Sequence, residues 1–463
     1  MLMTGEALLL KARLLAGIFF VSMLLLPRAG FAAAPHITSQ PLSTNVLAGS
    51  NATFKVTATG SGTLVYRWSF NGTNLTNSTH ISDATATTLT VNNITASDAG
   101  NYRVVVTNNQ GSATSSIATL TVLFRPSITS QPQSQTTYFG ATAVFSVTAG
   151  GTGPLKYQWR FGGTLLSDGG QFTGSATNAL NIANVQPANI GNYQVIVTNN
   201  YGAITSSVAA LNATNRTHYV NVANTNPVAP YMDWITAATN IQDAVDACVA
   251  GDSVLVTNGI YASGSRVISG MTNCVVVTNL ISLMSVSGPA QTIIDGGGAK
   301  RCVYLINGVW LSGFTLMNGN TTGRGGGASC EPTTVLTNCV LTGNGAGDEG
   351  GAVNGGTLFN CTLTGNSCTF GGAAANSKLS NCTVTGNYGG YGGGAAWVTM
   401  DNCVVNNNTS WSIGGGVASG TLNNCTLIGN ICDQHGGAAV YSTLTNCILA
   451  SNSSQTYEGG GVD

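Results

Sequence analysis

The chain has 463 residues, of which only 7% are charged, and its 15 basic and 16 acidic residues leave a formal net charge of -1 at pH 7. This length corresponds to about two to four domains. A surface without excess positive charge attracts neither phosphate backbones nor anionic bilayers, so nucleic acid and anionic membrane surfaces are excluded as partners.

The first 34 residues have the pattern of a secretory signal peptide. Lys11 and Arg13 precede an apolar run over residues 14–26, and small residues follow at Ala32, Ala33 and Ala34. The alternative is an N-terminal membrane anchor, but the run is shorter than the ~20 apolar residues that span a bilayer. We therefore expect residues 1–34 to be removed on export, leaving a secreted or cell-surface protein without a transmembrane segment.

The next part of the chain contains two copies of one unit at a shift of 91 residues. Four landmarks recur at this shift, from Pro41 to Pro132, Gly49 to Gly140, Trp68 to Trp159 and Tyr102 to Tyr193. Within each copy, short runs of alternating apolar and polar residues, such as ATFKVTA and YRVVVTN, are separated by Gly and Asn turns. This pattern predicts a β-sandwich in each copy.

Each copy resembles the I-set immunoglobulin-like domains. The resemblance rests on the two Trp residues and on the DAGNYRV run over residues 98–104, in which it makes Tyr102 a tyrosine corner. In the second copy Asn189 replaces the acidic residue of this run. The resemblance implies one domain over residues 35–124 and another over residues 125–214. The resemblance indicates the fold but not the function, since such modules serve both as spacers and as binders.

Both cysteines that form the disulfide of this family are missing from each copy. Val56 and Val104 occupy the two positions in the first copy, and Val147 and Val195 occupy them in the second. We therefore expect these sandwiches to be stabilised by packing alone, without a disulfide.

From residue 215 the pattern changes to that of a solenoid. The stretch TNIQDAVDACVAGD has Ile241, Ala244, Val245 and Cys248 at helical spacing, and Thr239 with Gln242 is placed as a capping box. A strand follows this short amphipathic helix. The order resembles the N-terminal cap of pectin-lyase-like β-helices, which implies that the helix covers the first coil.

A repeat of about 21 or 22 residues forms the body of the solenoid. Each repeat has an Asn-Cys pair, an apolar residue three positions before the Cys and another two positions after it. We expect the Asn of each pair to form an αL corner and the flanking apolar residues to enter the core. The six pairs are Asn338 with Cys339, Asn360 with Cys361, Asn381 with Cys382, Asn402 with Cys403, Asn424 with Cys425, and Asn446 with Cys447.

Two further columns follow from this repeat. A second Asn stands five positions after each of these Cys residues, from Asn344 to Asn452, and is expected to form amide ladders between coils. A Gly run, followed in most repeats by Ala or Val, is expected to make a tight turn. The repeats resemble right-handed parallel β-helix proteins, and the NCTLTGN and GGAA pattern also resembles the chlamydial polymorphic outer-membrane proteins. The predicted fold is all-β, with two tandem immunoglobulin-like sandwiches and a right-handed parallel β-helix over residues 215–463 with its short capping helix.

The column of cysteines has two interpretations. A metal site needs thiolates in a tetrahedral cluster, whereas this column places one thiol in each coil. The favoured interpretation is a file of small buried thiols in the core. We predict no metal and no cofactor.

Enzymes of the β-helix class carry clustered acidic and basic residues on one face, and no such column is visible between Asn338 and Asp463. Asp401 is interpreted as a turn residue beside a corner. His435 next to Asp433 is the one candidate for a general base, but an exposed turn pair is favoured. Arg324 and Glu331 fall in an insertion and could line a cleft. No catalytic residue is assigned, although a polysaccharide lyase or hydrolase stays an alternative.

The remaining face carries Asn, Thr and Ser with scattered aromatic residues, and this composition suits sugar rings. The leading hypothesis is a surface protein that binds carbohydrate or another extracellular ligand; the second alternative is a structural spacer. The aromatic candidates are Tyr388, Tyr391, Trp397, Trp411 and Tyr441.

The repeat is also expected to continue beyond residue 463. The spacing of the Asn-Cys pairs places the next pair at about position 468 or 469. We therefore expect the natural protein to have further coils and a cap or anchor.

Overall fold

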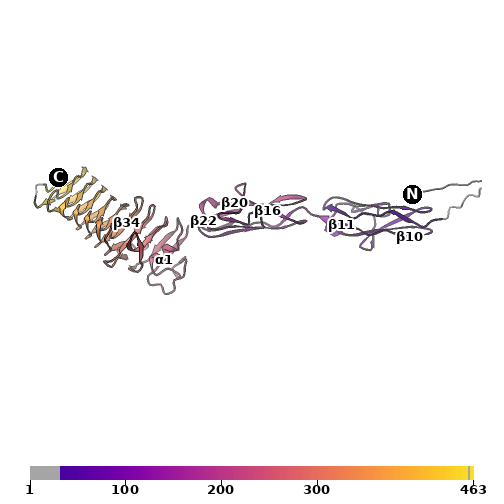
Figure 1. The fold of residues 1–463 in the computed structure, drawn as a ribbon, viewed down its shortest axis with the longest axis horizontal. Helices are drawn as coiled ribbons and strands as arrows, with labels where there is room; N and C mark the ends of the chain where they lie inside the picture. Colours follow the sequence, from indigo (N-terminus) through magenta and orange to yellow (C-terminus); the bar gives the residue numbers. More distant parts are fainter. Residues whose placement is uncertain (1–31, 457–458, 463) are drawn as a thin grey trace, which may run out of the picture. The chain divides into compact units, whose positions relative to one another are not determined.

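The computed structural model describes residues 32–456 and 459–462, which are built almost entirely from β-strands (Figure 1). The predicted signal peptide lies outside the described residues except for residues 32–34. The fold consists of two immunoglobulin-like sandwiches followed by a parallel β-solenoid, as predicted. Among the residues that the structure places, no helix is both long and apolar enough to span a membrane.

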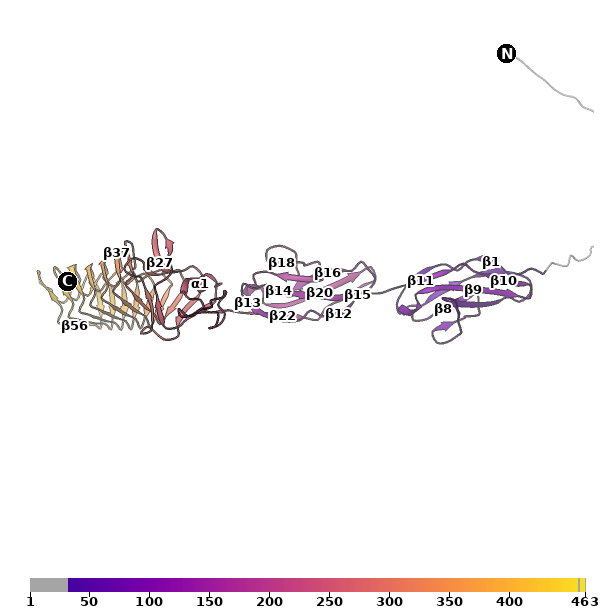
Figure 2. The same ribbon diagram turned by 90° about the horizontal axis from the view of Figure 1, so that it is seen from below.

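The first sandwich has one sheet in the order β2-β11-β9-β5-β6, with β10 paired to β9, and two smaller sheets, β3-β8-β7 and β1-β4 (Figure 2). Its strands are β1 (His36–Ser39), β2 (Thr44–Leu47), β3 (Ala52–Lys55), β4 (Thr57–Thr59), β5 (Val65–Phe70), β6 (Thr73–Asn74), β7 (Ile81–Ser82), β8 (Thr88–Val91), β9 (Gly100–Asn108), β10 (Gly111–Thr114) and β11 (Ala118–Leu123).

The second sandwich repeats this topology, with the sheets β13-β22-β20-β16-β17, β14-β19-β18 and β12-β15, and with β21 paired to β20. Its strands are β12 (Ser127–Ser130), β13 (Gln135–Tyr138), β14 (Ala143–Ser146), β15 (Thr148–Gly150), β16 (Lys156–Phe161), β17 (Thr164–Leu165), β18 (Phe172–Thr173), β19 (Ala179–Ile182), β20 (Gly191–Asn199), β21 (Gly202–Thr205) and β22 (Ala209–Thr214).

Each sandwich has an aromatic core and no disulfide. Trp68 and Trp159 are fully buried. The four valines at the positions of the missing cysteines are also buried, at 3% exposure or less. Packing of apolar side chains therefore replaces the disulfide in both domains.

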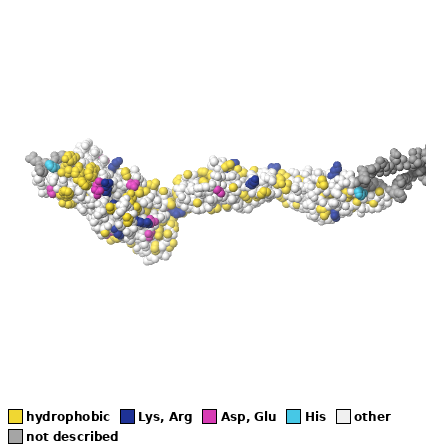
Figure 3. Space-filling view, viewed as in Figure 1, with side chains coloured by type: hydrophobic (Ala, Val, Ile, Leu, Met, Phe, Trp, Pro, Cys, Tyr) yellow, Lys and Arg dark blue, Asp and Glu magenta, His cyan; other side chains and the backbone are white. Residues whose placement is uncertain are grey.

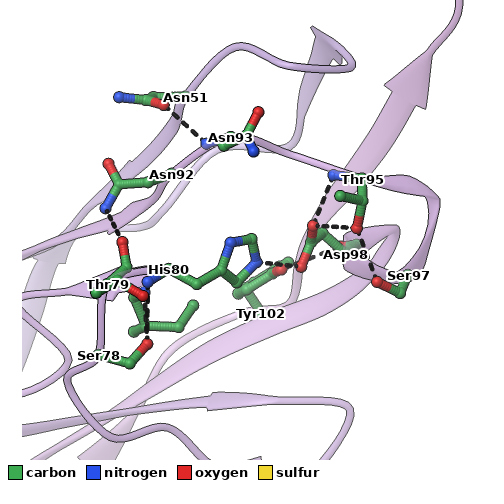
Figure 4. A network of polar contacts seen from close by, with 11 residues as sticks. Asn51, Ser78, Thr79, His80, Asn92, Asn93, Thr95, Ser97, Asp98 and Tyr102 are labelled. Atoms are coloured by element: carbon green, nitrogen blue, oxygen red, sulfur yellow. Dashed lines mark hydrogen bonds and ion pairs between the residues drawn. The ribbon is translucent and has the colours of Figure 1, made fainter.

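The predicted tyrosine corner is present in both sandwiches, and Figure 4 shows Tyr102 of the first one beside Asp98. The hydroxyl of Tyr102 donates to the carbonyl oxygen of Asp98 at 3.0 Å, and that of Tyr193 donates to the carbonyl oxygen of Asn189 at 2.7 Å. Each corner follows a 3₁₀ helix, η1 (Ala96–Asp98) or η2 (Pro187–Asn189). Burial raises the pKa of both phenols to about 12, chiefly because an ionised oxygen would lose its water.

Four sheets form the solenoid, and each successive coil adds one strand to a sheet. The first sheet contains β23 (Thr217–Val220), β24 (Ser253–Val256), β28 (Ser282–Ser285), β31 (Trp310–Ser312), β35 (Val335–Thr337), β39 (Thr357–Phe359), β43 (Lys378–Ser380), β47 (Thr399–Asp401), β51 (Thr421–Asn423) and β55 (Thr443–Thr445). The second contains β25 (Gly259–Tyr261), β29 (Thr292–Asp295), β32 (Thr315–Met317), β36 (Val340–Thr342), β40 (Thr362–Thr364), β44 (Thr383–Thr385), β48 (Val404–Asn406), β52 (Thr426–Ile428) and β56 (Ile448–Ala450).

The third and fourth sheets complete the coils. The third contains β26 (Arg266–Ile268), β27 (Met271–Val277), β30 (Arg301–Leu305), β34 (Ala328–Cys330), β38 (Val353–Asn354), β42 (Ala374–Ala375), β46 (Ala395–Ala396), β50 (Val417–Ala418) and β54 (Ala439–Val440). The fourth contains β33 (Asn320–Thr321), β37 (Gly345–Glu349), β41 (Ser367–Phe370), β45 (Tyr388–Tyr391), β49 (Thr409–Ile413), β53 (Ile431–Cys432) and β57 (Ser453–Ser454). Apart from the antiparallel pair β26 and β27, neighbouring strands are parallel.

The repeat columns have the predicted structural roles. The Asn of each Asn-Cys pair is an αL corner, with φ between 52° and 54°. The second Asn column forms a buried ladder in which the side-chain amide of one residue, such as Asn387, donates to the amide oxygen of the next, Asn408, at 2.9 Å. The cysteines of the pairs are free thiols with 1% exposure, except for the half-buried Cys447.

The capping helix is present, but its predicted capping box is wrong. The helix α1 (Ile241–Asp246) begins after Asn240, whose side-chain oxygen accepts from the backbone N–H of Asp243 at 2.8 Å. Gln242 is instead buried and bonds to the backbone of Val276, accepting from its N–H at 2.7 Å and donating to its oxygen at 3.1 Å. Because Asn240, a strong N-cap residue, caps the helix, the side chain of Gln242 is free to bond to the backbone groups of β27, which α1 covers.

Candidate functional site

Three aromatic side chains form a layer on the solenoid surface. Phe370 and Tyr391 are direct partners in the ladder between β41 and β45, and Trp397 lies at the corner after β46. The ring centroid of Trp397 is 5.3 Å from that of Tyr391 and 5.6 Å from that of Phe370. We call these three residues the aromatic layer. In Figure 3 hydrophobic side chains gather on part of the solenoid, beside a group of acidic and basic ones.

Trp397 has a backbone conformation that is costly for its side chain. Its φ is 52°, in the αL region, and the equivalent residues of the neighbouring coils are Asn376 at 54° and Ser419 at 55°. Asn adopts αL readily, whereas a bulky side chain there is strained. The indole is nevertheless 40% exposed, so burial in the core does not account for the strain. Strain that the core does not require is characteristic of functional positions.

A polar hollow of about 470 Å³ adjoins the aromatic layer. Glu349, which is the ladder partner of Phe370, is its central acceptor. Its carboxylate accepts from the side-chain amides of Asn376 at 2.7 Å and Asn354 at 3.1 Å, and pairs with Arg324 at 3.3 Å. The hollow is lined by Arg324, Cys330, Pro332, Glu349, Asn354, Gly355, Gly356, Asn376 and Lys378.

Acidic and basic residues of neighbouring coils come together at this hollow, although the sequence shows no column of them. Glu349 and Lys378 come from adjacent coils and line this one hollow. Arg324 from the preceding coil pairs with both Glu349 and Asp348. The repeat pattern did not reveal this arrangement, because the register between β37 and β41 shifts after Ala346.

The charged residues singled out from the sequence divide between the hollow and other parts of the solenoid. Arg324 lines a cleft as expected, but Glu331 is not among the residues lining the hollow, and its carboxylate accepts from Asn307 and from the hydroxyl of Tyr304. Asp433 and His435 lie in the loop between β53 and β54, and neither lines the hollow. Contrary to the expectation of a turn residue, Asp401 is the last residue of strand β47, where its carboxylate accepts from the side-chain amide of the corner residue Asn402 at 3.0 Å.

The remaining aromatic candidates divide between two surfaces. Tyr388 and Trp411 belong to the fourth sheet and line a second hollow of about 490 Å³, together with Ser367, Thr369 and other small or polar residues. The Trp411 ring lies over Gly390, where a Cβ atom would overlap it. Tyr441 is 71% exposed and belongs to the same corner column as Trp397.

One buried cluster has the residue types of a metal site but is fully committed to hydrogen bonds. His218, Cys248 and Asp252 place their ligand atoms within 4.8 Å of one another. The ring nitrogens of His218 contact the oxygens of Pro230 at 2.6 Å and Asp252 at 3.0 Å. Burial raises the pKa of Cys248 to about 12, and its neutral thiol donates to the carbonyl oxygen of Ala244. We assign this cluster a structural role at the first coil.

The sandwiches match a known family. Residues 34–108 and 125–199 match the family model described as Immunoglobulin domain. The match and the strand topology together define the chain as two immunoglobulin domains followed by a parallel β-solenoid.

Individual relatives match a limited part of the chain. Endoglucanase C of Cellulomonas fimi is 32% identical over 178 residues, which are 34% of this chain and 16% of that protein. Roundabout homolog 1 of Mus musculus is 32% identical over 179 residues, 37% of this chain and 11% of that protein. The chain thus spans less than a fifth of either relative. A solved I-band fragment of titin covers 41% of this chain and 72% of its own length, at 22% identity and a TM-score of 0.33.

Proposed function

We propose that this chain is an exported binding protein of bacterial type, secreted or held at the cell surface, that recognises carbohydrate through its solenoid. In this proposal the immunoglobulin domains act as the adhesive or spacing part. The observation that carries the proposal is the exposed, αL-strained Trp397, stacked on Tyr391 beside the polar hollow. We also propose that the repeats are related to pectin-lyase-like β-helices and to chlamydial polymorphic outer-membrane proteins, which they resemble in sequence.

The chemistry of the aromatic layer and of the adjoining hollow supports a sugar ligand. An aromatic ring presents a negative face, against which the C–H groups of a pyranose ring can pack. The adjoining hollow supplies carboxylate and amide groups that bond to hydroxyls and fix the orientation of a ligand. The name of one relative, Endoglucanase C, also places a similar sequence in a protein that acts on a polysaccharide.

Affinity electrophoresis in gels that contain soluble polysaccharides tests this proposal. We expect at least one polysaccharide to retard the wild-type protein, and Trp397→Asn to remove the retardation, because Asn occupies this corner one coil earlier. Trp310→Thr is the matched control, since Trp310 is 44% exposed on the first sheet and Thr stands at its position in later coils. Equal retardation of wild type and Trp397→Asn by every polysaccharide, or none at all, would refute the proposed site.

A second candidate function is cleavage of a polysaccharide at the same hollow. It is favoured by the approach of Glu349, Arg324 and Lys378 to one cavity. Release of new reducing or unsaturated ends, abolished by Glu349→Gln, would establish this activity. A protein that neither binds nor cleaves polysaccharide would instead be a spacer.

A further inference from the structure

Two aromatic side chains stand two coils apart in one corner column. The column runs through Gly355, Asn376, Trp397, Ser419 and Tyr441, and every member has a positive φ. Gly, Asn and Ser are small, whereas Trp397 and Tyr441 project large rings that are 40% and 71% exposed. Two separate coils therefore tolerate the same unfavourable combination of a bulky side chain and an αL backbone.

The spacing of the two rings is fixed by the ladder beneath them. Ala396, Ala418 and Val440, which precede Trp397, Ser419 and Tyr441, pair in register without a slip. Backbone hydrogen bonds from Trp397 N–H to the Ala418 oxygen and from Ser419 N–H to the Val440 oxygen continue this register. Strands of a sheet lie ~4.8 Å apart, so the attachment points of Trp397 and Tyr441 are separated by ~9.6 Å along the solenoid axis.

This separation matches a particular class of polysaccharide. In an extended β-1,4-linked pyranose chain successive rings are turned over, so the same ring face recurs at every second sugar, at about the separation of two coils. An α-1,4-linked chain coils and does not present its rings in this way. No member of the column is charged, which favours a neutral chain.

We infer that the solenoid binds a neutral, β-1,4-linked pyranose chain that lies parallel to the solenoid axis, with one sugar on Trp397 and the second sugar along on Tyr441. The intermediate sugar lies over Ser419, whose hydroxyl is held at 2.7 Å from the hydroxyl of Tyr391. This inference rests on the proposed function and adds the linkage and the direction of the ligand. It also predicts that at least three sugars are needed to contact both rings, because a disaccharide reaches only one of them.

Calorimetry with oligosaccharides of defined linkage tests the inference. The probes are a hexasaccharide and a disaccharide from each of cellulose, β-mannan and starch, so that β-1,4 and α-1,4 linkages are compared at equal length. We expect a β-1,4 hexasaccharide to bind the full chain at least about tenfold more tightly than the starch hexasaccharide. Tyr441→Asn should weaken the β-1,4 hexasaccharide about tenfold and leave the disaccharide unchanged, whereas Trp397→Asn should weaken both.

The outcomes separate this inference from the proposed function. Loss of binding in Trp397→Asn but not in Tyr441→Asn, or equal affinity for both linkages, overturns the inference and leaves carbohydrate binding intact. Failure of all six probes to bind overturns the inference, and the proposed function then depends on the wider polysaccharide panel. Trp310→Thr is the control, because it removes an exposed aromatic ring from another sheet of the solenoid. Thermal unfolding of each variant verifies that the solenoid remains intact.

Discussion

The indole ring of Trp397 stacks on the phenol ring of Tyr391, with centroids 5.3 Å apart and an angle of 22° between the ring planes. The two residues are separated in sequence by a turn of three glycines and by the two residues of β46. A side chain at Gly392 or Gly393 would overlap neighbouring backbone. The glycine turn therefore brings two aromatic residues of one coil together at the surface. This part of the aromatic layer is formed before any ligand binds.

Tyr441→Asn is expected to stabilise the protein. Tyr441 is 71% exposed, so little apolar contact is lost, while Asn relieves the αL strain at φ 50°. The free energy of unfolding should rise by about 1 kcal/mol. Urea unfolding followed by circular dichroism measures this change. If Tyr441→Asn is less stable than the wild type, the tyrosine supports the fold. Its αL conformation would then not indicate a binding role.

The sequence columns predict the fold because each column imposes one local conformation. An Asn at every corner, an apolar residue on either side and a Gly run at every turn leave few alternatives for the chain. The site depends instead on residues that depart from these columns. Trp397 and Tyr441 stand where the column has Gly, Asn or Ser, and Glu349 enters the hollow because β37 shifts register against β41. The sequence shows that Trp397 and Tyr441 stand two repeats apart. Only the structure shows that both occupy αL corners, where a bulky side chain is strained.

Asn387→Leu is expected to destabilise the solenoid by about 3 kcal/mol or more. The Asn387 oxygen accepts from the backbone N–H and from the side-chain amide of Asn366, each at 2.9 Å. Its own amide donates to the Leu363 oxygen at 3.0 Å and to the amide oxygen of Asn408 at 2.9 Å. Leucine has a similar size but leaves these buried groups unpaired.

The control for this prediction is Asn381→Gly. Asn381 is exposed, and its αL conformation at φ 53° is one that glycine adopts freely. Chemical unfolding should place this variant within about 0.5 kcal/mol of the wild type. A loss of similar size in both variants would show that the amide ladder has no special contribution.

The cysteines are expected to be unreactive while the protein is folded. All twelve are free thiols, and eleven of them are buried. Burial raises the pKa of Cys368 to about 11 and that of Cys248 to about 12, which suppresses the reactive thiolate at neutral pH. Titration with a thiol reagent at pH 8 should modify the half-buried Cys447 first, and all the others only after denaturant is added. Rapid modification of several thiols in the native protein would contradict the buried column.

The first sandwich is expected to lose stability in acid through Asp98. Burial opposes ionisation of this carboxylate. The hydrogen bonds from His80 and from the backbone and hydroxyl of Thr95, together with the charge of His80, outweigh this effect and hold the pKa of Asp98 below its ordinary value (Figure 4). A group with a lowered folded pKa stabilises the native state fully above its unfolded pKa. That contribution is lost as the pH falls through the unfolded value and then through the folded one.

Calorimetry of wild type and Asp98→Asn between pH 7 and pH 2 measures this contribution. The second sandwich already has Asn189 at this position, where its side-chain oxygen accepts from the N–H of Gln186 at 2.7 Å, so the variant is compatible with the fold. The wild type should melt at the higher temperature at pH 7, and the difference should shrink below about pH 4, where the unfolded carboxyl protonates. Asp83→Asn, at an exposed turn, should leave the pH dependence unchanged. A difference between wild type and Asp98→Asn that persists undiminished at pH 2 would show that the carboxylate acts through its shape and not through its charge.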